Sequence, residues 1–461
     1  MMEITGFRVQ NLHFNVMKVM SKISGFLLLT VALSAAEKID IAEGRKHWAF
    51  RPIQNRALPV IKNKSWPSNT IDYFILARLE QAGLEPAAPA ENRVLERRIH
   101  YALRGLPSDG ETDLDKLMST PQYGERWARH WLDVVRYADS NGLDENAAHA
   151  NAWRYRDYVV NAFNSDKPFN LFVVEQIAGD LLEPKNEVHR RELVTATGFL
   201  SLGPKVLAEP DKVKMEMDII DEQIDTLGKS FLGLTLGCAR CHDHKFDPIP
   251  TADYYALAGV FKSTKTMNSL KTIAKWHENP VYTPKEKKLK EKSEELIAAQ
   301  KKVIAAFTEK ANQELLIERN LDKLPPKPQE LYSKSVKAEI EGLQDTLKRL
   351  ESQAFILPMA MGETDGNATE LPIFVRGDHN RPAKELQPRQ FPRVLSDAQP
   401  FTGKTSGRLE LAKWITDEKN PLTARVIVNR VWRWHFGRGL VVTTDNFGLL
   451  GQEPSHPDLL D

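Results

Sequence analysis

"YGERWARHWLDVVRYADSNG", residues 123–142, decides the fold class, because its apolar side chains recur with the period of an α-helix. The apolar face would consist of Trp127, Trp131, Val134 and Ala138, and the polar face of Arg126, Arg129, His130, Asp133 and Arg136. Arg129 and Asp133 have the spacing of an intrahelical ion pair. This stretch therefore predicts an amphipathic helix that packs its tryptophans into a core.

The same period continues on both sides of this stretch, from about residue 45 to residue 265. Further helices are predicted at residues 68–86, 91–107, 153–166, 170–182, 212–232 and 251–264. Capping residues and Gly or Pro stops bound several of them. Because strand-like alternation is scarce, we expect a mainly α fold, with residues 45–265 forming a multi-helix domain.

Two further regions follow this domain. Residues 284–353 are charged and amphipathic, and "LPPKPQ", residues 324–329, interrupts them, which predicts a helical hairpin or coiled-coil insertion. After residue 354 the chain is irregular, with one candidate strand at "IFVRG", residues 373–377. Helical patterns return at residues 406–417 and 420–440, so residues 370–461 are expected to form part of a second, α-rich domain.

The N-terminus has the pattern of a secretory signal peptide. Lys18 and Lys22 precede a short apolar run, Ile23–Ala36, that ends in small residues. We therefore predict a signal peptide at residues 1–36, export to the periplasm or the extracellular space, and no membrane span in the mature chain. An uncleaved membrane anchor is the alternative. The net charge of +1 gives no electrostatic reason to expect nucleic-acid binding.

Both cysteines of the chain lie in "GCARCHDHKFDPI", residues 237–249. The CxxCH pattern formed by Cys238, Cys241 and His242 is typical of c-type haem attachment, in which both thiols bind the haem and the histidine is an axial ligand. Predicted export favours this interpretation. A disulfide or a metal-stapled turn stays open. A structural zinc site needs four ligands, of which Cys238, Cys241 and His244 could supply three, and no fourth is evident. Another divalent metal could use His242 and His244, together with Asp243 and Asp247.

The second axial ligand of a haem at this position is not evident from the sequence. His130, His149, Met215 and Met217 have suitable side chains. A filled sixth position would favour electron transfer, and an open one would permit catalysis.

A group of carboxylates follows the opening stretch, in "RYADSNGLDEN", residues 136–146. Its acids do not have the spacing of a helix-loop-helix calcium site. Asp139 and Glu145 could form a carboxylate pair for acid–base chemistry on a sugar, with His130 as a third candidate catalytic residue. A solvated turn that ends the helix is the alternative.

The chain resembles the exported planctomycete-type proteins that join a cytochrome-c-associated PSCyt-type domain of unknown function to a PSD-type domain of unknown function. The resemblance lies in the stretches at residues 123–142, 153–169, 175–182, 231–257, 406–416 and 420–441. It implies export and a haem c at Cys238, Cys241 and His242, but no particular reaction. It also implies that this chain ends inside its second domain.

These observations predict an exported haem-c protein that transfers electrons to a redox partner protein or oxidises an extracytoplasmic substrate, for which carbohydrate is one candidate. Two alternatives remain from the sequence. One is a metal-dependent hydrolase that acts on polysaccharide, and the other is a non-catalytic binding or scaffold protein that uses residues 284–353 as a docking arm.

Overall fold

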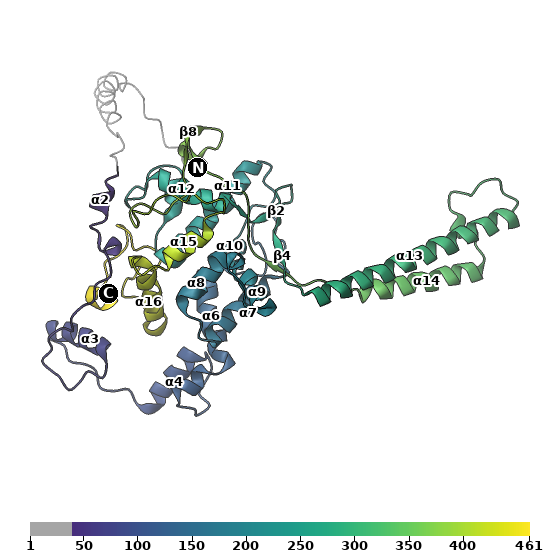
Figure 1. The fold of residues 1–461 in the computed structure, drawn as a ribbon. Coiled ribbons are helices and arrows are strands. Elements are labelled where there is room, and N and C mark those ends of the chain that lie inside the picture. The colour runs from purple at the N-terminus through teal and green to yellow at the C-terminus, as the bar shows by residue number, and fades with distance from the viewer. Residues whose placement is uncertain (1–38) are drawn as a thin grey trace, which may run out of the picture. The chain divides into compact units, whose positions relative to one another are not determined.

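The computed structural model describes residues 39–461, and most of its regular structure is helical, as predicted (Figure 1). The predicted signal peptide, residues 1–36, lies outside the described residues. The helices before residue 265 are α2 (Ile41–Gly44), α3 (Thr70–Gln81), α4 (Asn92–Leu103), α5 (Leu114–Met118), α6 (Pro121–Val134), α7 (Ala152–Asn164), α8 (Phe169–Ala178), α9 (Glu187–Ala196), α10 (Gly198–Ser201), α11 (Lys212–Leu227) and α12 (Thr251–Lys262). Within residues 39–461, no helix combines the length and the apolar character that crossing a bilayer requires.

Helix α6 is the helix predicted from the opening stretch. Trp127 and Trp131 are buried, and Arg129 pairs with Asp133 on the exposed side. The helix ends at Val134, earlier than the pattern suggested, because Arg136 adopts a left-handed conformation with φ of 49°. Arg136 therefore leaves the polar face, and its guanidinium pairs with Glu222 of α11.

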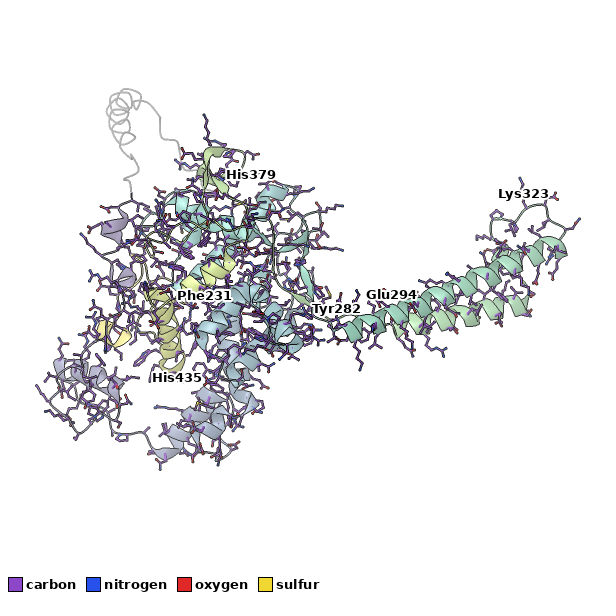
Figure 2. All side chains as sticks on the ribbon, in the orientation of Figure 1. Phe231, Tyr282, Glu294, Lys323, His379 and His435 are labelled. Carbon is purple, nitrogen blue, oxygen red and sulfur yellow. The ribbon has the colours of Figure 1, made fainter. Side chains whose placement is uncertain are left out.

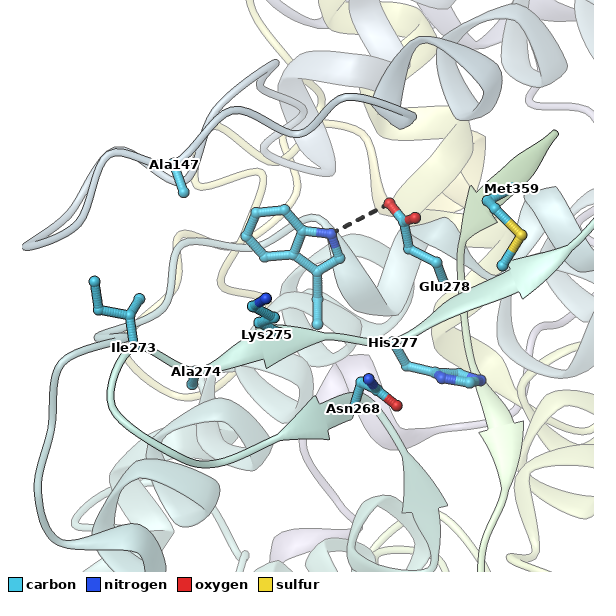
Figure 3. A pocket seen from close by; sticks show the side chains of 9 residues that line it. Ala147, Asn268, Ile273, Ala274, Lys275, His277, Glu278 and Met359 are labelled. Atoms are coloured by element: carbon cyan, nitrogen blue, oxygen red, sulfur yellow. Dashed lines mark hydrogen bonds between the residues drawn. The ribbon is translucent and has the colours of Figure 1, made fainter. Parts of the chain in front are cut away.

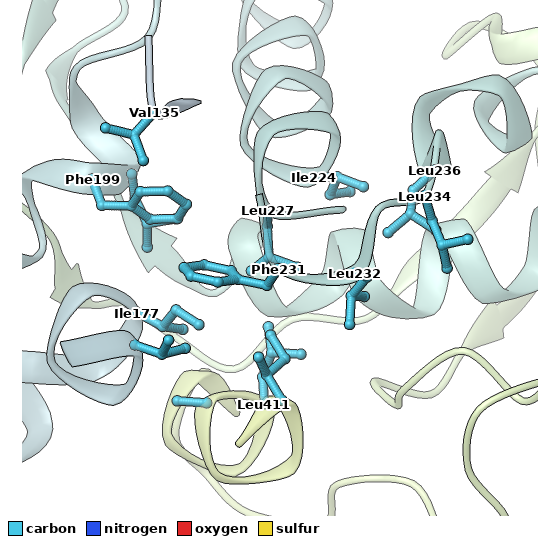
Figure 4. Close-up of a cluster of buried hydrophobic side chains, with 14 of the residues drawn as sticks. Val135, Ile177, Phe199, Ile224, Leu227, Phe231, Leu232, Leu234, Leu236 and Leu411 are labelled. Atoms are coloured by element: carbon cyan, nitrogen blue, oxygen red, sulfur yellow. The ribbon is translucent and has the colours of Figure 1, made fainter. Parts of the chain in front are cut away.

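One large apolar core joins most of these helices (Figure 4). Phe231 lies near its centre, with its ring centroid 5.7 Å from that of Trp131 and 5.3 Å from that of Phe199. Two C-terminal helices, α15 (Arg408–Ile415) and α16 (Pro421–Phe436), contribute Leu411 and Val426 to the same core. The short helix α17 covers Pro457–Leu460. The C-terminal region thus shares the core of the preceding helices.

Residues 39–461 also contain four antiparallel two-stranded sheets. They pair β1 (Thr264–Lys265) with β6 (Thr364–Asp365), β2 (Met267–Ser269) with β3 (Lys275–Trp276), β4 (Glu278–Pro280) with β5 (Met359–Met361), and β7 (Leu371–Phe374) with β8 (Pro382–Gln387). Only β7 overlaps the predicted strand. Strands β1 to β6 have only two or three residues each, too few for an alternating pattern to reveal them. Strand β8 has six, but its apolar Ala383 and Leu386 stand three apart and do not alternate.

Between β4 and β5 the chain forms two long helices, α13 (Pro284–Glu318) and α14 (Lys334–Ser352), which lie side by side (Figure 1). Thr283 and Glu286 form a capping box at the start of α13. Ala311 and Leu315 pack against Tyr332 and the first turns of α14. Because Pro280 of β4 pairs with Met359 of β5, the two ends of this helical segment lie next to each other.

Candidate functional site

The CxxCH residues lie on a short turn between α11 and α12. After a π-type turn, Gly228–Leu232, the chain reverses at Gly233, whose φ is 59°, and enters a 3-10 turn, Leu236–Arg240. Leu236 and Ala239 are buried and anchor this turn to the core. Cys238 and Cys241 are exposed and do not form a disulfide. The turn therefore presents two free thiols to solvent.

Arg240, between the two cysteines, fixes the turn to α11. Its Nη2 lies 2.7 Å from Asp218 Oδ1, and its Nη1 lies 3.5 Å from Asp221 Oδ2. From α12, the Tyr255 hydroxyl donates to the Arg240 carbonyl oxygen at 3.1 Å. These contacts hold the backbone of the turn from two helices while both thiols stay exposed.

His242 is exposed, and one of its ring nitrogens is already engaged. Its Nδ1 lies 2.7 Å from the carbonyl oxygen of Asp243. Because a carbonyl oxygen only accepts hydrogen bonds, Nδ1 carries the proton in this arrangement and Nε2 of the neutral ring keeps its lone pair. A backbone carbonyl on one nitrogen is a common way to orient the other nitrogen as a metal ligand.

His244 is buried, and both of its ring nitrogens have partners. Nδ1 accepts from the Asp247 amide at 2.8 Å, and Nε2 lies 3.2 Å from the Thr235 hydroxyl. Burial lowers the pKa of His244, which keeps the ring neutral. Asp243 accepts from the amide of Thr251 at the start of α12. Metal binding by His244 would require these structural bonds to break.

The histidines and acids of this turn therefore do not converge as metal ligands would. Among the residues that the structure describes, no group of three or more His, Cys, Asp or Glu side chains is arranged to hold a metal ion. The cysteines and His242 face solvent, whereas His244 and Asp247 face the protein.

Asp139 and Glu145 lie in the loop after α6, which the Ser140–Ala148 bridge folds back on itself. The Tyr137 hydroxyl donates to Asp139 Oδ1 at 2.7 Å, and burial together with this carboxylate raises the pKa of Tyr137. Glu145 contributes its backbone carbonyl, which accepts from the Asn141 side chain. Asp139 therefore has a neutral hydroxyl as its partner, and Glu145 supports the loop through its backbone.

The neighbouring polar residues of this loop have a structural role. Asp144 accepts from the amides of Leu207 and Ala208 at 3.0 and 2.8 Å. Asn141 bonds the backbone of Lys205 through both its amide nitrogen and its amide oxygen. These bonds fasten the loop to the segment before α11.

A cavity of about 650 Å³ adjoins this loop at Ala147 (Figure 3). Trp276 lines it, and its Nε1 donates to Glu278 Oε1 at 3.4 Å. His149 packs edge-on against the same indole, with centroids 4.6 Å apart. No sequence pattern pointed to this cavity, because the strands that carry Trp276 and Glu278 are too short to be predicted.

His130 belongs to an aromatic cluster formed by α6 and α16. Its ring stacks on Trp434 with centroids 4.8 Å apart. The ring of Trp127 contacts those of both His130 and His435, at centroid distances of 5.7 and 5.2 Å, and Figure 2 labels His435. Burial and the nearby charge of Arg126 lower the pKa of His130 to about 4, so the ring is neutral at pH 7. Beside this cluster is a second cavity of about 420 Å³, lined mainly by aromatic rings.

The other predicted axial ligands lie inside the protein. Met215 and Met217 are buried in apolar clusters, and His149 is buried against Trp276. The segment beside Cys241 is instead the turn after β7, where a Cβ on Gly377 would lie 2.7 Å from Cys241 Sγ. His379, on the same turn and labelled in Figure 2, pairs with Asp211 at 3.1 Å. No local pattern could have indicated this turn, because it lies far along the chain from Cys241.

Two family models match the chain in the order that the resemblance implies. Residues 70–266, which include the CxxCH turn, match PSCyt2, a protein of unknown function (DUF1549). Residues 407–461, which include α15 and α16, match PSD1, a protein of unknown function (DUF1553). The chain therefore belongs to the proteins that carry a PSCyt2 region followed by a PSD1 region. Searches of curated proteins and of solved structures found no match.

Proposed function

We propose that the chain is an exported haem-c protein in which Cys238 and Cys241 hold the haem and His242 is an axial ligand. The observation that carries this proposal is the arrangement of three donors on one turn: two free, exposed thiols and an exposed histidine whose Nδ1 lies 2.7 Å from a backbone carbonyl, so that the other ring nitrogen is the one available as a ligand. This donor set is the one that covalent haem attachment needs. Bound haem would supply one-electron chemistry.

The attachment uses only atoms that the turn already presents. Each thiol S–H would add across one vinyl C=C of the haem. The sulfur forms a covalent bond to one vinyl carbon, and the hydrogen atom is transferred to the other carbon. Nothing is lost or oxidised, so the chain should gain the mass of one complete haem. The contacts of Arg240 fix the backbone between the thiols, and the Asp243 carbonyl orients the imidazole.

The proposed role is electron transfer to a redox partner, or oxidation of an extracytoplasmic substrate such as a carbohydrate. The exposure of the turn supports it, because a partner could approach the site directly. Gly377 and Tyr255 would act as positioning residues, since both contact the turn without offering a ligand to iron.

The test is intact mass and a pyridine haemochrome spectrum of protein exported from a host with haem-c maturation machinery. The expected result is the added mass of one haem, which disappears in the Cys238→Ala/Cys241→Ala variant. His242→Ala should change the spectrum of the bound haem. His189→Ala, on α9, is the matched control and should leave the spectrum unchanged.

Two results would overturn the proposal. A chain two hydrogens lighter than its sequence would identify a disulfide. A chain of unmodified mass with stoichiometric zinc by elemental analysis would identify a metal-stapled turn and return the search to metal-dependent hydrolysis.

A further inference from the structure

Helix α13 has an apolar stripe that α14 does not cover. Leu289, Leu296 and Val303 follow each other at intervals of seven residues and are 46, 49 and 48% exposed. Three residues after each of these lie Lys292, Ala299 and Ala306, which are also exposed. We call these six residues the α13 stripe. Apolar residues at this spacing over three heptads are typical of a coiled-coil seam.

The stripe is separate from the seam that α13 shares with α14. That seam contains Ala311 and Leu315, which pack against Val336 and Ile340, and the Gln300 amide donates to the Leu343 carbonyl at 2.9 Å. Helix α14 thus covers one face of α13, and the stripe lies on another. Figure 2 shows the side chains of this pair of helices, with Glu294 on α13 and Lys323 in the connection labelled.

The charges beside the stripe alternate in sign. The position directly before each of the three large stripe residues is charged, and it is occupied by Lys288, Glu295 and Lys302. Glu309 follows Lys302 at the same interval of seven residues. Within residues 39–461, none of these four side chains forms an ion pair. The neighbouring Lys290 and Glu294, in contrast, pair with each other at 2.9 Å.

We infer that the α13 stripe is the interface of an antiparallel homodimer, with a second copy of this chain as its occupant. In an antiparallel coiled coil the flanking positions of one helix face the same positions of the other in reverse order. Lys288 would then face Glu309 of the second copy, and Glu295 would face Lys302 of the second copy. By symmetry each pair forms twice, so all eight charges are matched.

The same register also matches side-chain sizes. Leu289 would face Ala306 of the second copy, and Leu296 would face Ala299 of the second copy. Large residues opposite alanines let two helices approach closely. Val303 would face Lys292, whose aliphatic stem can cover an apolar neighbour while its ammonium group reaches water.

Neighbouring registers are disfavoured by charge. A shift of one heptad in one direction places Glu295 opposite Glu309 and Lys302 opposite its own copy. A shift in the other direction places Lys288 opposite Lys302 and Glu295 opposite its own copy. Flanking charges that match in one register and repel in the others are a means of specifying partner and orientation.

The test is the solution mass of the mature chain by sedimentation equilibrium, with charge-reversed variants. The Glu295→Lys/Glu309→Lys variant makes the flank entirely basic, and Lys288→Glu/Lys302→Glu makes it entirely acidic. Each alone should raise the dimer dissociation constant at least about tenfold, because four attractive pairs become repulsive. An equimolar mixture of the two variants should dimerise again.

Glu341→Lys/Asp345→Lys is the matched control, since it makes the same change of charge on exposed positions of α14 and should leave the dissociation constant unchanged. Leu296→Asp should also prevent dimerisation, and circular dichroism would verify that each variant keeps its helices. A wild-type chain that stays monomeric up to about 0.1 mM would overturn the inference. So would homodimers that persist in both charge variants, or a mixture that fails to associate. None of these readouts depends on haem.

Discussion

The helices that share the large apolar core, here called the helical body, and the α13–α14 hairpin both contain many charged side chains. The two regions differ in how far their ion pairs are buried. In the body, the guanidinium of Arg408 is fully buried, and its two terminal nitrogens each lie 2.7 Å from an oxygen of Asp180. In the hairpin, Lys290 and Glu294 pair at 2.9 Å with side chains 37 and 59% exposed. A buried charge that loses its partner stays desolvated, whereas an exposed one is simply hydrated. The same type of contact therefore has a different energetic weight in each region.

The buried charges of the body extend beyond Arg408. Glu222 pairs with Arg136, and Glu363 accepts from the hydroxyls of Ser201 and Thr266, each at 2.8 Å. Burial raises the pKa of Glu363 to about 7 and lowers that of Lys205 to about 8. The body thus contains groups that change charge near neutral pH.

The largest effect is expected on removal of the buried Arg408, compared with an exposed pair in the same part of the molecule. Arg408→Ala would leave Asp180 buried without its main partner, and Asp365 would lose a contact of 3.0 Å. We expect the free energy of unfolding to fall by about 3–5 kcal/mol in urea titrations. Arg129→Ala, which removes an exposed intrahelical pair, should cost less than about 1 kcal/mol. Equal losses in the two variants would refute the distinction between buried and exposed pairs.

A second effect should depend on pH. The pKa of Glu363 is about 7 in the folded chain, against 4.5 for an ordinary glutamate, so the folded state binds more protons between these values. Stability from this group is therefore present at low pH and is lost as pH rises from 4.5 to about 7. Glu363→Gln should remove this loss, so the stability of the variant relative to wild type should rise by roughly 2–3 kcal/mol between about pH 5 and about pH 8. Parallel pH profiles of the two proteins in urea titrations would show that Glu363 stays ionised when folded.

The smallest effect is expected in the hairpin. Lys290→Ala removes one exposed pair at i,i+4 and should change the free energy of unfolding by at most about 0.5 kcal/mol. High salt should erase even that difference, because it screens exposed charges. A loss above about 1 kcal/mol would mean that this pair is not simply an exposed one, and a higher dimer dissociation constant of Lys290→Ala in the sedimentation experiment would then assign it to an interface.

Local patterns in the sequence predicted the features that depend on residues close together in the chain, such as individual helices and the spacing of the CxxCH motif. The period of residues 123–134 predicted α6, and the CxxCH spacing singled out the turn that presents both thiols. Arg136 was expected on the exposed face of that helix, yet it turns inward to Glu222, which is 86 residues away. Neither the positive φ of Arg136 nor its distant partner can be predicted from the spacing of apolar residues in a helix.

The same limit applies to the surroundings of the candidate site. Gly377 approaches Cys241, and Arg408 reaches Asp180, which lies 228 residues earlier. Such contacts depend on how separate segments pack, and the local patterns of residues along the chain do not reveal that packing. His244 illustrates the point within the motif itself, since its type and position suit a metal ligand but the fold uses both of its nitrogens for structure.

Because Pro280 pairs with Met359, the hairpin is an insertion whose two ends join the body at the same place. The body does not need any particular length of chain between these two residues, so the hairpin can lengthen or shorten by whole heptads without disturbing the core. The β4–β5 pair is thus a point at which this architecture can exchange one arm for another, and with it one self-association preference for another, while the thiol-bearing turn stays the same.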